Sequence, residues 1–338
     1  MTDNQKWSAP RLALAMGDPS GISPELTAGL LDDAAVSAAA QMIVIGDRRV
    51  LGLGEAHAGV RLNIPVVGSA DEALATAGTV FWDLGHLDPE TTSVGEVSLA
   101  GGQSAITNFR SAIALARDGL VDGVCFTPFN KAAMRLAHSS YEDEIVFISE
   151  ELGFHGKASE FNILEGLWNA RVTSHIPLAD VSKSITREAI LENIELTQVA
   201  LVTAGVAQPR IGVAALNPHA GDNGNFGREE IDIIGPAVEE GQRRGWGSQG
   251  PFPSDTVFVR AVKGQYDAVL TMYHDQGQIA MKLIGFDKGV TLLGGFAFPI
   301  CTPAHGTAYD IAGKGVANLG ASRNAILLAA QMARASAA

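Results

Sequence analysis

Three histidines follow apolar, strand-like segments at equivalent places along the chain. These segments, each ending on its histidine, are Ala170–His175, Ile211–His219 and Ala268–His274. Neutral imidazoles are common metal ligands, and three of them leave coordination positions open for a substrate. We therefore predict that His175, His219 and His274 bind one divalent metal ion, either Zn, Mg, Co or Mn.

A structural alternative exists for each of these histidines. A lone histidine at a strand end most often satisfies local hydrogen bonds, and only the matching placement of all three favours a shared ion. Asp275 directly follows His274. Its carboxylate is placed to orient a metal-bound imidazole or to hold a substrate hydroxyl, with a plain salt bridge as the alternative.

Three glycine-rich turns are candidates for holding an anionic group. They are Met16–Glu25, Asn217–Gly227 and Ala312–Gly315. None completes the Gly-x-Gly-x-x-Gly pattern after a strand, and Gly52-Leu-Gly54 lacks the third glycine, so the standard dinucleotide-binding turn is absent. Asn217 and Gly221 are the candidate cofactor-binding residues. The alternative for any one turn is a tight chain reversal without a ligand.

The elements that carry these residues alternate along the whole chain. The expected strands are Arg11–Met16, Gln41–Ile45, Asn63–Val67, Thr79–Trp82, Val121–Phe126, Phe161–Leu164, Ala170–Ser174, Arg210–Leu216, Ala268–Met272 and Val290–Leu293. The expected helices are Pro24–Leu31, Asp71–Thr76, Gln103–Asp118, Arg187–Ala204, Arg228–Arg244 (kinked or restarted at Pro236) and Asn324–Ala337. Apolar strands separated by helices predict a mostly parallel sheet that is covered on both faces.

The length of 338 residues suggests two domains. We expect an α/β protein of two α/β/α lobes with a central cleft, one lobe formed by residues 1–135 and 303–338 and the other by residues 136–302. Ligands of such sheets bind beyond the carboxyl ends of the strands, where the three histidines are expected.

Composition narrows the classes of function. The net charge of −13 gives no general attraction to nucleic acid or to anionic lipid. No apolar run reaches the roughly 20 residues that span a bilayer, and the polar start, Met1–Pro10, lacks the core of a signal peptide. The two cysteines, Cys125 and Cys301, lie in apolar surroundings, which favours a reducing compartment. We expect a cytoplasmic protein.

Six segments together resemble the 4-hydroxythreonine-4-phosphate dehydrogenase (PdxA) family. They occur in family order over nearly the whole chain: Met16–Glu25, Thr127–Lys131, Ser174–Leu178, Leu216–Gly221, Met272–Gly277 and His305–Ala308. The resemblance implies a fold like that of isocitrate and isopropylmalate dehydrogenases. It also implies a homodimer with the site at the subunit interface, NAD or NADP as cofactor, and a divalent metal. The family's metal-binding histidines fall on His175, His219 and His274.

The substrate contacts implied by the resemblance are largely changed in this chain. Where the family reads Gly-His-Thr-Glu, with the His and Thr touching substrate, this chain has Tyr-Glu142-Asp143-Glu. The family's substrate lysine is Lys282, its asparagine is Thr291 and its arginine is Ile300. The loss of an arginine and the gain of carboxylates disfavour a phosphate dianion. The alternative for Glu142 and Asp143 is that they begin a solvated helix.

The resulting hypothesis is the oxidation of a secondary alcohol in a small hydroxy-acid. The substrate would be similar to 4-phosphohydroxy-L-threonine, and decarboxylation would follow where a β-keto acid forms. Lys282 would orient the substrate carboxylate and return a proton, and Asp275 would act beside the metal. Within the family, the alternatives are a cis-dihydrodiol carboxylate or a phosphorylated sugar acid. Alternatives of other classes are a metal-dependent hydrolase and a two-lobed binding protein.

Overall fold

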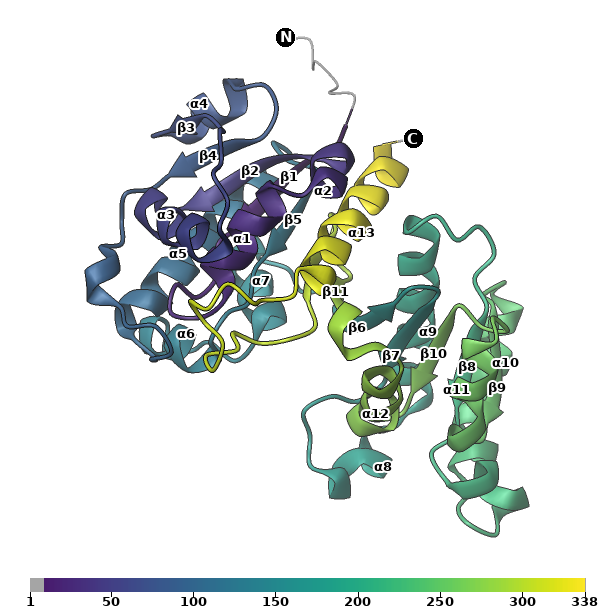
Figure 1. The fold of residues 1–338 in the computed structure, drawn as a ribbon. Helices are drawn as coiled ribbons and strands as arrows, with labels where there is room; N and C mark the ends of the chain where they lie inside the picture. The colour runs from purple at the N-terminus through teal and green to yellow at the C-terminus, as the bar shows by residue number, and fades with distance from the viewer. Residues whose placement is uncertain (1–8, 338) are drawn as a thin grey trace. The chain divides into compact units, whose positions relative to one another are not determined.

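The computed structural model describes residues 9–337 (Figure 1). Most of the polar start of the chain, on which the expectation of no signal peptide depends, lies outside the described residues. The chain divides into two units, one made of Met1–His155 and Ala297–Ala338 and the other of Gly156–Phe296. The divisions fall after residues 155 and 296, whereas the sequence predicts them after residues 135 and 302.

The first unit has six strands in the order β3-β4-β2-β1-β5-β12, and the strand pairs in this series are parallel. Its strands are β1 (Arg11–Ala15), β2 (Gln41–Gly46), β3 (Val66–Val67), β4 (Val80–Asp83), β5 (Gly123–Phe126) and β12 (Ile300–Pro303). Its helices are α1 (Ser23–Leu31), α2 (Ala34–Ala39), α3 (Arg48–Ala58), α4 (Ala70–Ala75), η1 (Pro89–Thr91), α5 (Leu99–Arg117), α6 (Lys131–Ala137), α7 (Glu144–Leu152) and α13 (Gly320–Ala337).

The second unit has the strand order β11-β6-β7-β10-β8-β9. Its strands are β6 (Ser159–Leu164), β7 (Leu167–Arg171), β8 (Ile211–Ala214), β9 (Ser248–Phe252), β10 (Ala268–Thr271) and β11 (Val290–Gly294). Its helical segments are η2 (Leu178–Asp180), α8 (Val181–Ser184), α9 (Arg187–Thr203), η3 (Pro218–Gly224), η4 (Glu230–Ile234), α10 (Gly235–Arg243), α11 (Ser254–Val262), α12 (His274–Gly285) and η5 (Phe286–Lys288). Strands β7, β10, β8 and β9 pair in parallel, whereas β6 pairs antiparallel with β7 and β11.

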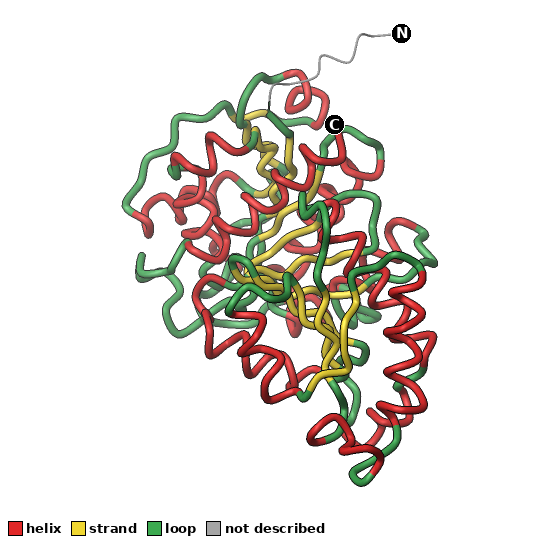
Figure 2. The backbone as a smooth tube through the Cα atoms, turned by 90° about the vertical axis from the view of Figure 1, so that its right-hand side faces the viewer, coloured by secondary structure: helices red, strands yellow, loops and turns green. Residues whose placement is uncertain are grey.

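The α/β class expected from the sequence is confirmed. Central strands such as β1, β5, β8 and β10 are buried at every residue, and Figure 2 shows strands in yellow with helices in red around them. Strands buried on both faces are apolar throughout, which is why they could be recognised in the sequence.

Short polar side chains begin many of the helices. Their oxygens accept hydrogen bonds from backbone N–H groups of the first turn, which would otherwise lack partners. The residues that do so are Asp33, Asp47, Ser69, Ser98, Asn130, Asp143 and Thr186. The restart at Pro236 is also confirmed, because the π-helical segment η4 ends at Ile234 and α10 begins with Gly235 and Pro236.

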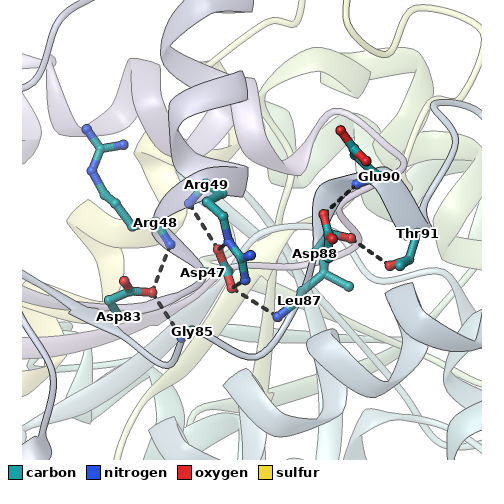
Figure 3. A network of polar contacts seen from close by, with 9 residues as sticks. All are labelled: Asp47, Arg48, Arg49, Asp83, Gly85, Leu87, Asp88, Glu90 and Thr91. Atoms are coloured by element: carbon teal, nitrogen blue, oxygen red, sulfur yellow. Dashed lines mark hydrogen bonds and ion pairs between the residues drawn. The ribbon is translucent and has the colours of Figure 1, made fainter.

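Asp47 fixes the loop that follows β4 in the first unit (Figure 3). This buried residue follows β2 and accepts hydrogen bonds from Arg49 N and Nε, each at 3.0 Å, and from Leu87 N at 2.9 Å. Burial alone would raise the pKa of its carboxyl, but the hydrogen bonds from Arg49 and Leu87 outweigh that effect and hold the pKa below its usual value. The carboxylate thus joins the start of α3 to a segment 40 residues away.

Candidate active site

The three histidines follow three neighbouring strands of the second unit. Strands β7, β10 and β8 lie side by side and parallel, with Thr271 of β10 opposite Arg171 of β7 and Leu270 opposite Val213 of β8. His175, His274 and His219 come shortly after the carboxyl ends of these strands. The structure therefore places all three at one edge of this sheet, which is where ligands of parallel sheets bind.

Hydrogen bonds between the chain segments leaving β7 and β10 bring two of the histidines together. The N–H and the Oγ1 hydroxyl of Thr173 donate to the carbonyl of Met272 at 3.1 and 2.8 Å. The rings of His175 and His274 lie 5.6 Å apart between centroids. They line a pocket of about 440 Å³, together with Ser174, Ile176, Val181, Tyr273 and Asp275.

Asp275 orients the ring of His274. Its Oδ1 lies 2.6 Å from Nδ1 of His274, so the carboxylate accepts a hydrogen bond from that nitrogen when Nδ1 carries the proton. Nε2 of the ring is then left as the lone-pair donor. This carboxylate–imidazole arrangement is typical of histidines that bind metal ions.

His219 lies in an unusual backbone segment. His219, Ala220, Gly221, Asp222 and Asn223 all have left-handed conformations, with φ between 43° and 80°. The ring of His219 is exposed and packs against Phe226 at 6.2 Å between centroids. Among the described residues, His219 is not part of the pocket lining, and no three His, Cys, Asp or Glu side chains are arranged to hold one metal ion.

Gln276 joins the segments that lead to His274 and His219. Its Oε1 accepts from Met272 N at 2.6 Å, and its Nε2 donates to the carbonyl of Ala215 at 2.7 Å. The same Nε2 donates to Ser254 Oγ at 2.7 Å. One side chain therefore fixes the exits of β10 and β8 relative to each other.

The donor set fits a divalent metal ion in its chemistry. Two imidazoles face one pocket, one of them is oriented by a carboxylate, and a third imidazole follows the adjacent strand. Two of the three, His175 and His219, have positive φ, a conformation that costs free energy and is concentrated at functional sites. Coordination by all three would require the exposed ring of His219 to turn toward the other two.

The second unit also contains the predicted substrate residues Lys282 and Thr291. Lys282 is exposed on α12, which begins with His274. Thr291 lies in β11 with 9% of its surface exposed, and its Oγ1 accepts from Nδ2 of Asn162 at 3.4 Å. Asn162 in turn accepts from Nη1 of Arg171 at 2.6 Å.

Arg171 and Glu160 form an ion pair beside His175. Their Nη2 and Oε2 atoms are 2.8 Å apart, and Nε of Arg171 donates to Oγ of Ser174 at 3.1 Å. Burial would raise the pKa of Glu160, but the guanidinium of Arg171 and the amide of Asn162 outweigh it and lower the pKa. The signal in the sequence for this pair was an arginine, Arg171, directly beside the apolar residues of the expected strand Ala170–Ser174, and the pair was not predicted.

The other three predicted substrate residues belong to the first unit. Asp143 begins α7, and its side chain accepts from Val146 N at 2.9 Å, as in the helix-start alternative considered above. Glu142 is exposed beside it. Ile300 lies in β12 with 0% of its surface exposed, so it is a core residue here and not an accessible substrate contact.

The candidate cofactor residues lie in the segment around His219. The amide of Asn217 is held by two carboxylates, because Nδ2 donates to Glu229 at 2.7 Å and to Glu230 at 3.0 Å. Gly221 is buried in the left-handed segment. Both residues therefore have structural partners within the second unit, and their binding of a cofactor stays a prediction.

Comparison with known protein families identifies one match over most of the chain. The sequence model described as "Pyridoxal phosphate biosynthetic protein PdxA" matches residues 38–329. A protein of Rhizobium meliloti named "Putative 4-hydroxythreonine-4-phosphate dehydrogenase 2" is 59% identical over 98% of this chain and 96% of its own length.

Solved structures of similar sequence share the fold. The 4-hydroxythreonine-4-phosphate dehydrogenase of Klebsiella pneumoniae has a TM-score of 0.85 at 34% identity, covering 97% of this chain and 99% of its own. A terephthalate 1,2-cis-dihydrodiol dehydrogenase of Burkholderia xenovorans has a TM-score of 0.67 at 28% identity, covering 96% and 98% of the two chains. Among the described residues, no helix is both long and apolar enough to cross a membrane.

Proposed function

Because the chain belongs to the PdxA family, whose matched members are named dehydrogenases, we propose that it oxidises a secondary alcohol of a small hydroxy-acid at a divalent metal, with NAD or NADP as acceptor. The chain is thus an oxidoreductase acting on CH–OH groups. The observation that carries the metal-dependent part is the pair His175 and His274, which face one pocket beside the carboxylate of Asp275. The homodimer expected from the resemblance is part of this proposal.

The imidazoles of His175, His219 and His274 would hold the metal ion. A divalent ion bound there would lower the pKa of a coordinated hydroxyl group and favour loss of its proton near neutral pH. A bound nicotinamide would take the hydride, which no protein side chain can accept.

The other roles in the proposed reaction are assigned to side chains of this protein. Asp275 holds Nδ1 of His274, which leaves Nε2 as the nitrogen that would bind the metal ion. Ile176, Val181 and Tyr273 form an apolar part of the pocket wall, against which an apolar part of the substrate would pack. Lys282 is proposed to orient the substrate carboxylate and to return a proton where decarboxylation follows oxidation.

The pocket lining favours a second candidate substrate. Its described residues include no lysine or arginine, and its only carboxylate is that of Asp275. A phosphate dianion needs cationic partners of its own, and Lys282, the one lysine proposed to contact substrate, is assigned to the carboxylate. A non-phosphorylated diol with an apolar ring suits imidazoles beside Ile176, Val181 and Tyr273. A cis-dihydrodiol carboxylate, the substrate type in the name of the Burkholderia xenovorans enzyme, is therefore the second candidate.

A panel of phosphorylated and plain hydroxy-acids, including cis-diols, tests the proposal when each is supplied with NAD or NADP and one divalent metal. The expected result is metal-dependent reduction of the nicotinamide by at least one member. Turnover of 4-phosphohydroxy-L-threonine at about 10 per second, a typical enzyme rate, would overturn the preference for a non-phosphorylated substrate. Metal-dependent hydrolysis without any nicotinamide would instead support the hydrolase.

Replacement of His274 by Ala tests the metal site directly. We expect a loss of at least about tenfold in metal affinity together with loss of turnover, because one of the two imidazoles facing the pocket is removed. His86→Ala, a change of an exposed histidine in the first unit, is the matched control and should alter neither. Unchanged metal affinity in the His274 variant, measured by equilibrium dialysis, would remove His274 from the ligand set.

A further inference from the structure

The left-handed backbone segment around His219 is locally unfavourable and must be stabilised by other contacts. Five consecutive residues from His219 to Asn223 have positive φ, and four of them are not glycine. Successive L-residues in this conformation bring Cβ too close to the following carbonyl oxygen, so the segment is disfavoured by its own local energy. Such a conformation persists only where surrounding contacts impose it.

The carboxylate of Glu230 makes contacts that can impose it. Glu230 is 4% exposed, and its Oε1 accepts hydrogen bonds from Leu216 N at 2.8 Å and from Asn217 N at 2.7 Å. Its Oε2 accepts from Nδ2 of Asn217 at 3.0 Å. One buried carboxylate therefore satisfies three N–H donors immediately before His219.

The same carboxylate also contacts the chain after His219. A Cβ atom placed on Gly221 would lie 2.7 Å from Oε2 of Glu230, so the backbone of Gly221 packs directly against this oxygen. Gly221 itself has a φ of 80°. Glu230 thus contacts residues on both sides of His219, the arrangement needed to hold the backbone between them.

We propose that Glu230 is the positioning residue for His219, which it holds at the carboxyl end of β8 so that the imidazole can join the metal site. The inference rests on the proposed function, since it takes His219 as a metal ligand. Glu230 itself lies in η4, buried and saturated with N–H donors, and does not take part as a ligand. Its effect on the metal must therefore pass through His219.

A double-mutant cycle on Co²⁺ affinity tests this path. Glu230→Gln keeps the size of the side chain but replaces one of its two acceptor oxygens by an NH₂ donor and removes the charge, so either the backbone N–H groups of Leu216 and Asn217 or the Nδ2 of Asn217 lose their acceptor. It should therefore weaken Co²⁺ binding about 10- to 100-fold, the range for residues that orient ligands. His219→Ala should weaken binding at least as much. In the His219→Ala background, Glu230→Gln should have no further effect.

The visible absorption of bound Co²⁺ gives a second measurement. The Glu230→Gln and His219→Ala proteins should show the same altered spectrum, because both lack the same imidazole ligand. Amide hydrogen exchange at Leu216 and Asn217 should be faster in the Glu230→Gln protein without metal, which reports the loosened segment independently of any ion. Gly221→Ala disturbs the same contact from the other side and serves if the glutamine variant does not fold.

Glu229→Gln is the matched control. Glu229 shares the amide of Asn217 with Glu230 but accepts neither backbone N–H, so its replacement should leave Co²⁺ affinity within about twofold of the unmodified protein. An equal loss from Glu230→Gln in both backgrounds would show a general structural role and overturn the inference. Unchanged affinity in His219→Ala alone would instead show that His219 is not a ligand, which overturns the ligand set of the proposed function.

Discussion

Buried carboxylates that accept backbone N–H groups hold loops in both units. Asp47 does so for the segment around Leu87 in the first unit, and Glu230 does so for the segment around His219 in the second. A hydrogen bond to an ionised acceptor is stronger than one between neutral groups, and a buried N–H without a partner is costly. One such residue can therefore fix the backbone of a loop.

Replacement of Asp47 by Ala should lower the free energy of unfolding by about 1–3 kcal/mol, because it removes the helix cap of α3 and leaves Leu87 N without its acceptor. The ion pair with Arg49 adds little to this figure, since the arginine side chain is 53% exposed and screened by water. Urea denaturation at neutral pH measures the loss. Asp88→Ala, which removes an exposed cap in the same network, should lower the free energy of unfolding by less than Asp47→Ala does.

The contribution of Asp47 should depend on pH with a definite sign. Its pKa in the folded protein is below the usual 3.8, so the folded state favours the ionised form. The stabilisation is present in full above pH 3.8 and is lost as the pH falls through the lowered folded value. The stability difference between the two proteins should therefore shrink in acid, and a constant difference down to pH 2 would contradict this account.

The candidate metal-binding histidines could be predicted from the sequence, but the side chains that contact their segments could not. His219 and His274 could be identified because each follows an apolar strand, which is a local pattern. The strand expected before His175, Ala170–Ser174, is in fact β7 at Leu167–Arg171, which ends four residues before the histidine. Glu230 and Arg171 could not be identified, because their partners lie in other elements: Leu216 N is 14 residues from Glu230, and Glu160 lies on the neighbouring strand β6. Ile300 was placed by a count along the chain, which gives no information about burial.

At the scale of elements, helices α1 and α3 approach each other closely at a glycine. Gly52 and Gly54 both lie inside this helix. A Cβ atom on Gly54 would lie 2.1 Å from the carbonyl oxygen of Pro24 in α1, whereas one on Gly52 would lie 3.6 Å from the flexible end of Arg48. Only Gly54 is therefore required by packing.

Gly52→Ala should stabilise the protein by about 0.5–1 kcal/mol, because alanine loses less backbone entropy in a helix than glycine. Gly54→Ala gains the same helix propensity but forces α1 and α3 apart, so it should be destabilising by about 1–3 kcal/mol. Thermal unfolding of the two variants side by side provides the comparison. Destabilisation by both substitutions would show that the Gly52 site has less room than the contacts indicate.

The two strands that were not predicted, β9 and β12, have compositions that are unusual for strands. Strand β9 contains Gly250 and Pro251, and it pairs with β8 alone at the edge of the second unit's strand series, where proline is tolerated. Strand β12 is short and ends in Pro303. The expected strand Asn63–Val67 is in fact only Val66–Val67, because a pattern of apolar residues does not show how many of them find a hydrogen-bonding neighbour.

At the scale of the whole molecule, the second unit is one continuous stretch of chain, while the first is made of two. All three candidate metal histidines belong to the second unit. It also has its own apolar core, formed by residues such as Leu164, Val257, Tyr266 and Met281. The presence of two units could be predicted from the chain length. The boundaries between them could not, because they depend on contacts between residues far apart in the sequence.

A protein consisting of residues 156–296 alone should fold cooperatively and bind Co²⁺ within about tenfold of the affinity of the full chain, if three ligands from this unit complete the site. Calorimetry of unfolding and Co²⁺ titration provide the measurements. A folded fragment that binds no Co²⁺ would show that a ligand comes from elsewhere.

The division of the first unit has a consequence for the order of events during synthesis. Strand β12 pairs with β5, and helix α13 packs against both strands and against α2. Strand β12 and helix α13 are both translated after residue 296, whereas β5 and α2 are translated early. During synthesis, the whole second unit is therefore complete before β12 is available to pair with β5. Nascent chains stalled at that stage should be the most prone to aggregate and to recruit chaperones.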